Sequence, residues 1–563
     1  MKRKGRTNDK DFPVPPGVVS NGKFKPSIEK IPPVFDFSKR SHQTAFWMLF
    51  NTIIYGKGEN RPPVVDGKAL KLIVLCFVLI SVSSGGLRGQ TVSAQAFADE
   101  RLKQMRADLQ LKIEKKEVAS VAVGVIKDGK IIWKETFGWA DREQNIKADS
   151  KTIYALGSLS KSITATGLWV LVEKGKLGVD DPVERHLKSA KLEYFQGASS
   201  DLKIRHLLNM EGGIGHQFEY FYDGERQEIP SLKEQIRRYG FVAFPPGKVH
   251  FYSNFSLSIV DQIIADVAGA SFAGFMKREV FNPLGMNRTF VERPAKTAVA
   301  KGYDAKGNPT PSFIFQPRGG AGMYSTLDDL LAYGLGHLNR KKLLKTETLN
   351  ALRRTAKDAP NPYYASGWGV LPTADGRITL LSNGSIIGAS TTILVIPNDD
   401  LIVVCLTNTT IGNGFTDGVA FNVAGALLEG YRESFGNLVK KIEPFFASRT
   451  FTPDESFIGE WLGEIKTREG NFPVRMIFKS DEIVVSINGQ KEEIIKKALL
   501  ENGLLNFQFK GAIPAAEAMK APHQISLKLM RTGDKLVGIA TARSDVEKPK
   551  FFLPFYIELN KKL

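Results

Sequence analysis

Residues 157–171 read GSLSKSITATGLWVL, and the rest of the chain is best interpreted outward from this stretch. Gly157 allows a close backbone approach, and apolar residues at helical spacing predict a helix over Ser160 to Gly175. Because positions i and i+3 share one helix face, Lys161 can reach the hydroxyl of Ser158. A lysine beside a buried serine is destabilised as a cation, so it can accept a proton. The stretch predicts a serine nucleophile, Ser158, activated by Lys161.

The pattern Ser-x-x-Lys is weak evidence by itself, since it occurs four times, beginning at Ser20, Ser27, Ser158 and Ser200. A capping serine followed by a solvent-facing lysine would give the same pattern. Ser20 and Ser27 lie in an irregular leader, and Ser200 precedes a short predicted helix at residues 204–208. The context therefore favours Ser158.

A second candidate motif is Tyr252-Ser253-Asn254, which follows Pro245-Pro246-Gly247-Lys248. In an extended segment, residues i and i+2 point to the same side. The Tyr252 hydroxyl could then relay protons, and Asn254 could hold a substrate amide. The alternative is a tyrosine in a surface loop.

With these two motifs, residues of about 115–430 resemble the serine β-lactamases and penicillin-binding proteins. The resemblance is to the class C-like branch of β-lactamase-related serine hydrolases, which includes esterases and D-amino-acid peptidases. Further stretches that support it are Gly138 to Asp141, Ile204 to Leu208, Phe281 to Met286, Gly320 to Thr326 and Tyr364 to Gly369. It implies an α+β fold in which an antiparallel sheet is flanked by helices, with a helical lobe.

The resemblance also implies a role for each motif residue. Ser158 would attack a carbonyl, while Lys161 and Tyr252 shuttle the proton. Asn254 would position the substrate, and an acyl-enzyme would form and be hydrolysed without a cofactor. No segment resembles the Glu-x-x-Leu-Asn pattern that class A enzymes use for deacylation, which favours Tyr252 as the base acting on water.

The family's third motif is Lys- or His-x-Gly on an edge strand, and here its place is taken by Ser382-Asn383-Gly384. Gly384 fits, and the amide of Ser385 would join that of Ser158 in an oxyanion hole. Ser382 differs, because the family's basic residue helps to bind a substrate carboxylate. We therefore expect neutral esters or amides to be better substrates than carboxylate-bearing ones.

Other interpretations remain open at this point. Arg318 or Lys248 could supply the missing cation from a loop. The protein could be a β-lactamase, a D-Ala-D-Ala carboxypeptidase or a D-aminopeptidase. It could also be a catalytically weak binding or sensor protein of the same fold.

Several other kinds of site find no support in the sequence. The histidines show no metal-binding spacing and no glycine-rich phosphate loop occurs, so we expect neither a metal nor a cofactor. Half of the net charge of +18 lies in residues 1–96, and no basic run resembles a nucleic-acid arm. The expected partner is a small-molecule or peptide substrate.

The beginning of the chain predicts export. Residues 1–66 form an irregular, proline-rich basic leader, and translation is expected to begin near Val64 or Val65. Residues 67–96 read as a signal peptide with an apolar run from Leu72 to Val82 and a cleavage site at Ala94-Gln95-Ala96. We expect a periplasmic or extracellular protein, with an uncleaved membrane anchor as the alternative. Cleavage would leave Cys405 as the single cysteine, so no disulfide is expected.

The remaining pattern predicts two domains, at 100–440 and 455–563. The first has predicted hairpins at both ends, at residues 120–133 and 393–406, with helices between them and a closing helix at 421–428. The second shows short strands separated by turns, which predicts a small antiparallel β domain without a catalytic cluster.

Overall fold

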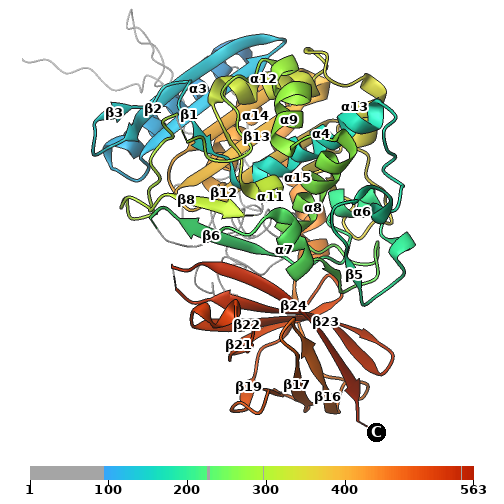
Figure 1. Ribbon diagram of the computed structural model, residues 1–563. Coiled ribbons are helices and arrows are strands. Elements are labelled where there is room, and N and C mark those ends of the chain that lie inside the picture. The colour runs from blue at the N-terminus through green and yellow to red at the C-terminus, as the bar shows by residue number, and fades with distance from the viewer. Residues whose placement is uncertain (1–93, 225–227, 296, 317, 547, 563) are drawn as a thin grey trace, which may run out of the picture. The chain divides into compact units, whose positions relative to one another are not determined.

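The computed structural model describes residues 94–563, with gaps at 225–227, 296, 317, 547 and 563 (Figure 1). The predictions for the leader and for the signal peptide up to residue 93 lie outside the described residues. Ala94 to Ala96, the expected cleavage site, form the start of helix α3 (Ala94–Glu114).

The catalytic region is built on an eight-stranded antiparallel sheet in the order β10-β11-β12-β13-β14-β1-β2-β3. Both predicted hairpins are present, and strand β1 pairs with β14, with Val123 opposite Cys405. The two ends of the region thus meet in the centre of one sheet. The strands are β1 (Ser120–Lys127), β2 (Lys130–Asp141), β3 (Ile146–Lys147), β10 (Tyr364–Ala365), β11 (Trp368–Pro372), β12 (Ile378–Ile386), β13 (Ala389–Ile396) and β14 (Leu401–Thr407).

Helices cover both faces of this sheet, which confirms the predicted α+β fold (Figure 1). Helices α3 and α14 (Asn413–Leu427) pack on one face. Helix α12 (Leu327–His337) and the turn η1 (Gly157–Leu159) pack on the other. Every residue of β13 and β14 is buried, as expected for strands covered on both sides.

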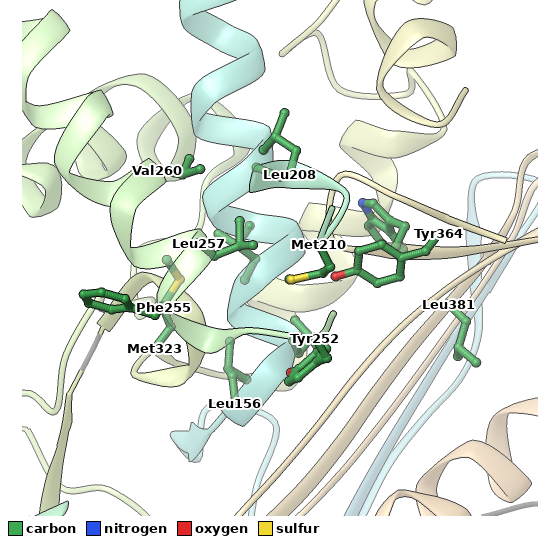
Figure 2. Packing of buried hydrophobic residues seen from close by; sticks show 14 of the residues in the cluster. Leu156, Leu208, Met210, Tyr252, Phe255, Leu257, Val260, Met323, Tyr364 and Leu381 are labelled. Carbon is green, nitrogen blue, oxygen red and sulfur yellow. The ribbon is translucent and has the colours of Figure 1, made fainter. Parts of the chain in front are cut away.

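Helix α4 (Ser160–Glu173) lies at the centre of the helical lobe, and its residues from Ser160 to Leu171 are all buried. Figure 2 shows apolar side chains gathered around it, among them Leu208, Leu257 and Tyr252. Helix α8 (Asn254–Ala268) packs against α4. The Ser253 hydroxyl caps α8 by accepting from the Ser256 amide, so Tyr252 and Asn254 lie at its beginning.

The other helices of the catalytic region are short except α15, which has 16 residues. They are α5 (Val183–His186), α6 (Ile204–Leu208), α7 (Leu232–Tyr239), α9 (Phe272–Met276), α10 (Asn282–Leu284), α11 (Arg318–Ala321), α13 (Thr346–Leu352) and α15 (Tyr431–Phe446), with turns η2 (Ser199–Asp201), η3 (Lys277–Phe281) and η4 (Pro397–Asp399). Two small ladders join β4 (Tyr154–Ala155) to β9 (Tyr324–Ser325) and β5 (Glu193–Tyr194) to β7 (Phe241–Val242).

In the part of the chain that the structure describes, no single helix is both long and apolar enough to cross a membrane. One bent pair, Asn254–Ala268 with Phe272–Leu284, meets the criteria by length and composition alone.

The C-terminal region is all β, as predicted from its pattern of short strands. Six of its strands match predicted ones, while the longest, β24, was missed in the sequence. The strands are β15 (Arg449–Thr450), β16 (Gly459–Lys466), β17 (Asn471–Phe478), β18 (Ile483–Ile487), β19 (Glu493–Ile495), β20 (Leu499–Glu501), β21 (Leu504–Lys510), β22 (His523–Thr532), β23 (Lys535–Ser544) and β24 (Phe551–Lys561), with the turn η5 (Ala518–Lys520).

The C-terminal sheet continues into the catalytic region through two further strands. Strand β24 pairs with β6 (Phe218–Tyr222), and β6 pairs with β8 (Phe313–Gln316). The ladder places Phe552 opposite Phe218, and the two rings stack with centroids 4.5 Å apart. The division into independent domains at 100–440 and 455–563 stays a prediction.

Candidate active site

The turn that carries Ser158 is fixed by its neighbours. Gly157 has a positive φ of +54°, which a residue with a side chain rarely adopts. The Ser160 hydroxyl donates to the Gly157 carbonyl oxygen at 2.6 Å and accepts from the Met323 amide at 3.1 Å. Ser158 therefore lies on a rigid turn directly before α4.

Lys161 is almost fully buried beside Ser158, with 1% of its surface exposed. Its Nζ lies 3.0 Å from Ser158 Oγ, 2.5 Å from Asn254 Oδ1 and 2.7 Å from the Gly320 carbonyl oxygen. The amino group is thus held in one position against the serine hydroxyl.

Tyr252 and Asn254 approach the same two side chains from the start of α8. The Tyr252 hydroxyl lies 2.7 Å from Ser158 Oγ and donates to Asn254 Oδ1 at 3.4 Å. Ser253 between them is extended, with φ −146° and ψ 118°, so both neighbours point the same way, as predicted. Lys161 Nζ also lies 4.6 Å from the centroid of the Tyr252 ring. The structure brings together all four residues of the first two motifs.

Gly384 of the third motif lies against the nucleophile turn. A Cβ added at Gly384 would stand 2.0 Å from the Leu156 carbonyl oxygen and 2.6 Å from the Ser158 amide nitrogen. A Cβ added at Gly157 would stand 3.0 Å from the Ser385 amide nitrogen. The turn at Gly157 and Ser158 therefore packs closely against β12 at Gly384 and Ser385, the two segments that carry the amides predicted to form the oxyanion hole.

Ser382, at the position of the family's basic residue, is turned into the protein. It is 2% exposed, and its hydroxyl donates to Ser162 Oγ at 3.0 Å and contacts the Gly367 carbonyl oxygen at 3.5 Å. Strand β12 pairs with β11 over residues 378–381 and with β13 over residues 380–386. Ser382 is thus the first residue of β12 beyond the β11 ladder, and its hydroxyl links this strand to α4.

The structure shows the surroundings of the two loop cations considered as replacements, and their role stays a prediction. The Arg318 guanidinium lies 3.7 Å from Asp261 Oδ2 and 3.5 Å from Glu292 Oε2, so it already has two carboxylate neighbours. Burial raises the pKa of Asp261 to about 7, against the lowering effect of Arg318. Lys248 is exposed.

Two positioning groups were missed in the sequence because they lie far away along the chain. His216 is buried, and its Nδ1 accepts a hydrogen bond from the backbone N–H of Asn254 at 3.1 Å. From the sequence, His216 could be interpreted only as a cap or core residue. Asp417 of α14 accepts from Asn383 Nδ2 at 2.8 Å and from Thr392 Oγ1 at 2.6 Å. Burial raises the pKa of Asp417 to about 8.

Metal-binding groups were sought over the described residues. Within them, no cluster of three or more His, Cys, Asp or Glu side chains could hold a metal ion.

Comparison with known proteins identifies the class. A family model described as beta-lactamase matches residues 98–428, which is more than half of the chain. This protein therefore belongs to the beta-lactamase family of serine hydrolases.

Particular relatives are more distant. Protein flp of Staphylococcus aureus (strain N315) is 23% identical over 307 residues, which cover 53% of this chain and 61% of that protein. The chain thus spans less than two thirds of this relative's length.

Two solved structures share the fold. The octameric penicillin-binding protein homologue from Pyrococcus abyssi has a TM-score of 0.50 and 21% identity, covering 82% of this chain and 100% of that one. EstCE1, a hydrolase with promiscuous acyltransferase activity, has a TM-score of 0.50 and 22% identity, covering 59% and 99%.

Proposed function

We propose that this protein is an exported serine hydrolase that cleaves an ester or amide through an acyl-enzyme on Ser158. The observation that carries the proposal is the position of Ser158 Oγ, 2.7 Å from the Tyr252 hydroxyl and 3.0 Å from Lys161 Nζ. A serine hydroxyl is a weak nucleophile unless a neighbouring group accepts its proton. Both neighbours are within proton-transfer distance.

In the proposed acylation step, Ser158 Oγ attacks the substrate carbonyl while its proton passes to Tyr252 or Lys161. The carbonyl oxygen becomes an oxyanion between the amides of Ser158 and Ser385. The tetrahedral intermediate then collapses, and the leaving group departs with that proton. In deacylation, Tyr252 takes a proton from water, which attacks the acyl carbon, and the proton passes to Ser158 Oγ as the bond between Oγ and the acyl carbon breaks.

Asn254 has a binding role in this scheme. Its Oδ1 accepts from Lys161, which turns its amide N–H groups toward an acceptor on the substrate. The backbone N–H of Asn254 donates a hydrogen bond to His216 Nδ1, and this contact fixes the start of α8. This arrangement suits a substrate with an amide or ester carbonyl beside the reacting bond.

The substrate class rests on Ser382. A neutral, buried hydroxyl at this position offers no charge for a substrate carboxylate, which favours esters or amides over penicillins and D-Ala-D-Ala peptides. The similarity in fold to EstCE1, which is described as a hydrolase, is compatible with a hydrolytic reaction. The compact Ser158–Lys161–Tyr252 cluster argues against a catalytically weak binding protein.

Export is supported by the apolar run at residues 72–82.

The test uses the full chain with a fluorescent phosphonate and three substrates: a short-chain ester, a chromogenic cephalosporin and a D-Ala-D-Ala peptide. Ser158→Ala should abolish labelling and lower hydrolysis by roughly a thousandfold or more. Ser120→Ala is the control, because Ser120 is also a buried serine, but it lies on β1 and its hydroxyl donates to Asn408 Oδ1 directly after β14. Labelling that persists in Ser158→Ala would refute the assignment.

A further inference from the structure

Helix α8 carries a buried carboxyl group that the proposed reaction does not use. Asp261 lies about two turns after Asn254 on this helix, and 1% of it is exposed. Among the described residues, its Oδ2 atom has no hydrogen-bond partner, and the Nε of Arg318 lies 3.7 Å from it. A buried carboxyl oxygen without a hydrogen bond lowers stability, and an apolar residue in this place would avoid that cost.

Arg318, the partner of Asp261, begins the short helix α11, which packs directly on α8. A Cβ added at Gly319 would stand 2.8 Å from Asp261 Cβ. A Cβ added at Gly320 would stand 2.4 Å from the Asn254 carbonyl oxygen. The two glycines therefore allow the backbone of α11 to lie against the first turns of α8, with Asp261 at one end of the contact and Asn254 at the other.

The carbonyl groups of the same two glycines hold helix α4. The Gly320 carbonyl oxygen accepts from Lys161 Nζ at 2.7 Å, and the Gly319 carbonyl oxygen accepts from Thr164 Oγ1 at 2.8 Å. Arg318 directly precedes this pair, and its own carbonyl oxygen accepts from the Gly322 amide at 2.7 Å. The position of Arg318 thus bears on where one acceptor of the Lys161 amino group lies.

The charge of Asp261 changes near neutral pH. Burial raises the pKa of its carboxyl group to about 7; Arg318 acts to lower this pKa, and the exposed Glu292, which lies 3.5 Å from the Arg318 guanidinium, acts to raise it. Among the described residues, these two are the charged groups that act on Asp261. Lys161 faces α8 from α4, but at Asn254. Above this pKa Arg318 has a charged partner in the interior, and below it the partner is neutral.

We propose that Asp261 is a positioning residue for Lys161: its carboxylate holds Arg318 and with it α11, so that the Gly320 carbonyl oxygen stays in place beside Lys161 Nζ. The inference rests on the proposed function, because it concerns how the amino group is directed toward Ser158. Protonation of Asp261 removes the charge-assisted attraction to the guanidinium. Helix α11 is then held less firmly, so the reaction should require the charged form of Asp261.

The experiment measures kcat and KM of the full chain for a neutral short-chain ester from about pH 5.5 to 9. The wild-type kcat should decrease as pH falls through about 7. Asp261→Asn keeps the shape without the charge. Its kcat at high pH should be lower by roughly tenfold to a hundredfold, with KM unchanged and without the step near neutral pH.

Two further variants sharpen the test. Arg318→Gln removes the partner at a side chain that is 28% exposed, and should reproduce both defects. Because the two residues act as a pair, the double variant should be no worse than either single variant. Asp266→Asn is the matched control, since Asp266 is the other carboxylate of α8 and accepts from the amides of Lys188 and Ser189. It should keep the wild-type kcat and pH profile.

A wild type whose kcat shows no step near pH 7 would overturn the inference, and this result needs no variant to fold. A step that persists in Asp261→Asn would overturn it too, because the step then belongs to another group; if that variant does not fold, a step that persists in Arg318→Gln has the same meaning. Phosphonate labelling of Ser158 in the wild type is measured in parallel. Labelling that succeeds while the step is absent removes only this inference, whereas failed labelling removes the proposed function.

Discussion

Replacing Tyr252 by phenylalanine separates two roles of its hydroxyl. The ring lies among buried apolar side chains, next to Leu156 and Met210 in Figure 2, and only 6% of the residue is exposed. Phenylalanine keeps this packing, so the fold should remain. The substitution removes the 2.7 Å contact with Ser158 Oγ and the 3.4 Å contact with Asn254 Oδ1.

The magnitude depends on what the hydroxyl does. If it only orients Ser158, the loss is that of a neutral hydrogen bond, about 0.5–1.5 kcal/mol, or roughly twofold to tenfold in rate. If it carries the proton, general acid–base catalysis is lost, and kcat should fall by roughly a hundredfold to ten-thousandfold. We expect the larger effect, because the Tyr252 hydroxyl lies 2.7 Å from Ser158 Oγ, closer than Lys161 Nζ at 3.0 Å.

Stopped-flow measurement of the acylation burst and of steady-state turnover, together with a melting curve, distinguishes the two cases. Tyr431→Phe is a matched control, since it removes a buried hydroxyl that contacts Thr379 at 2.9 Å. It should lower stability by about 1 kcal/mol and leave kcat unchanged. A decrease of less than tenfold for Tyr252→Phe, with normal melting, would refute the proton-relay role and leave Lys161 as the base.

Two further predictions concern the support of the third motif. Burial raises the pKa of Asp417 from its ordinary value of 3.8 to about 8, so between these values the unfolded chain loses a proton that the folded chain retains. The free energy of unfolding should therefore decrease as pH rises from about 4 to 8, by up to about 1.4 kcal/mol per pH unit. In urea unfolding, Asp417→Asn should flatten this slope. Equal slopes in the wild type and the variant would contradict the raised pKa of Asp417. Gly384→Ala places a methyl group 2.0 Å from the Leu156 carbonyl oxygen and should lower kcat by roughly a hundredfold by displacing an oxyanion donor. In the control Gly436→Ala, the added methyl group meets no atom within 4 Å, so kcat should be unchanged. Normal kinetics in Gly384→Ala would show that strand β12 can shift to accommodate the methyl group.

Local patterns in the sequence predicted the elements that later proved important. The spacing of Ser158 and Lys161 on one helix face follows from the period of the α-helix, and the common side of Tyr252 and Asn254 follows from an extended segment. The two hairpins at the ends of the catalytic region were visible as apolar runs around turn residues. These features depend on neighbours within a few positions, which is the range that sequence periodicity reports.

The tertiary structure alone decided which distant residues surround these motifs. The contacts of Asp417 with Asn383, of His216 with Asn254 and of Ser382 with Ser162 join segments separated by 34 to 220 positions. No local pattern encodes such a pairing, because it arises only when sheet and helices pack.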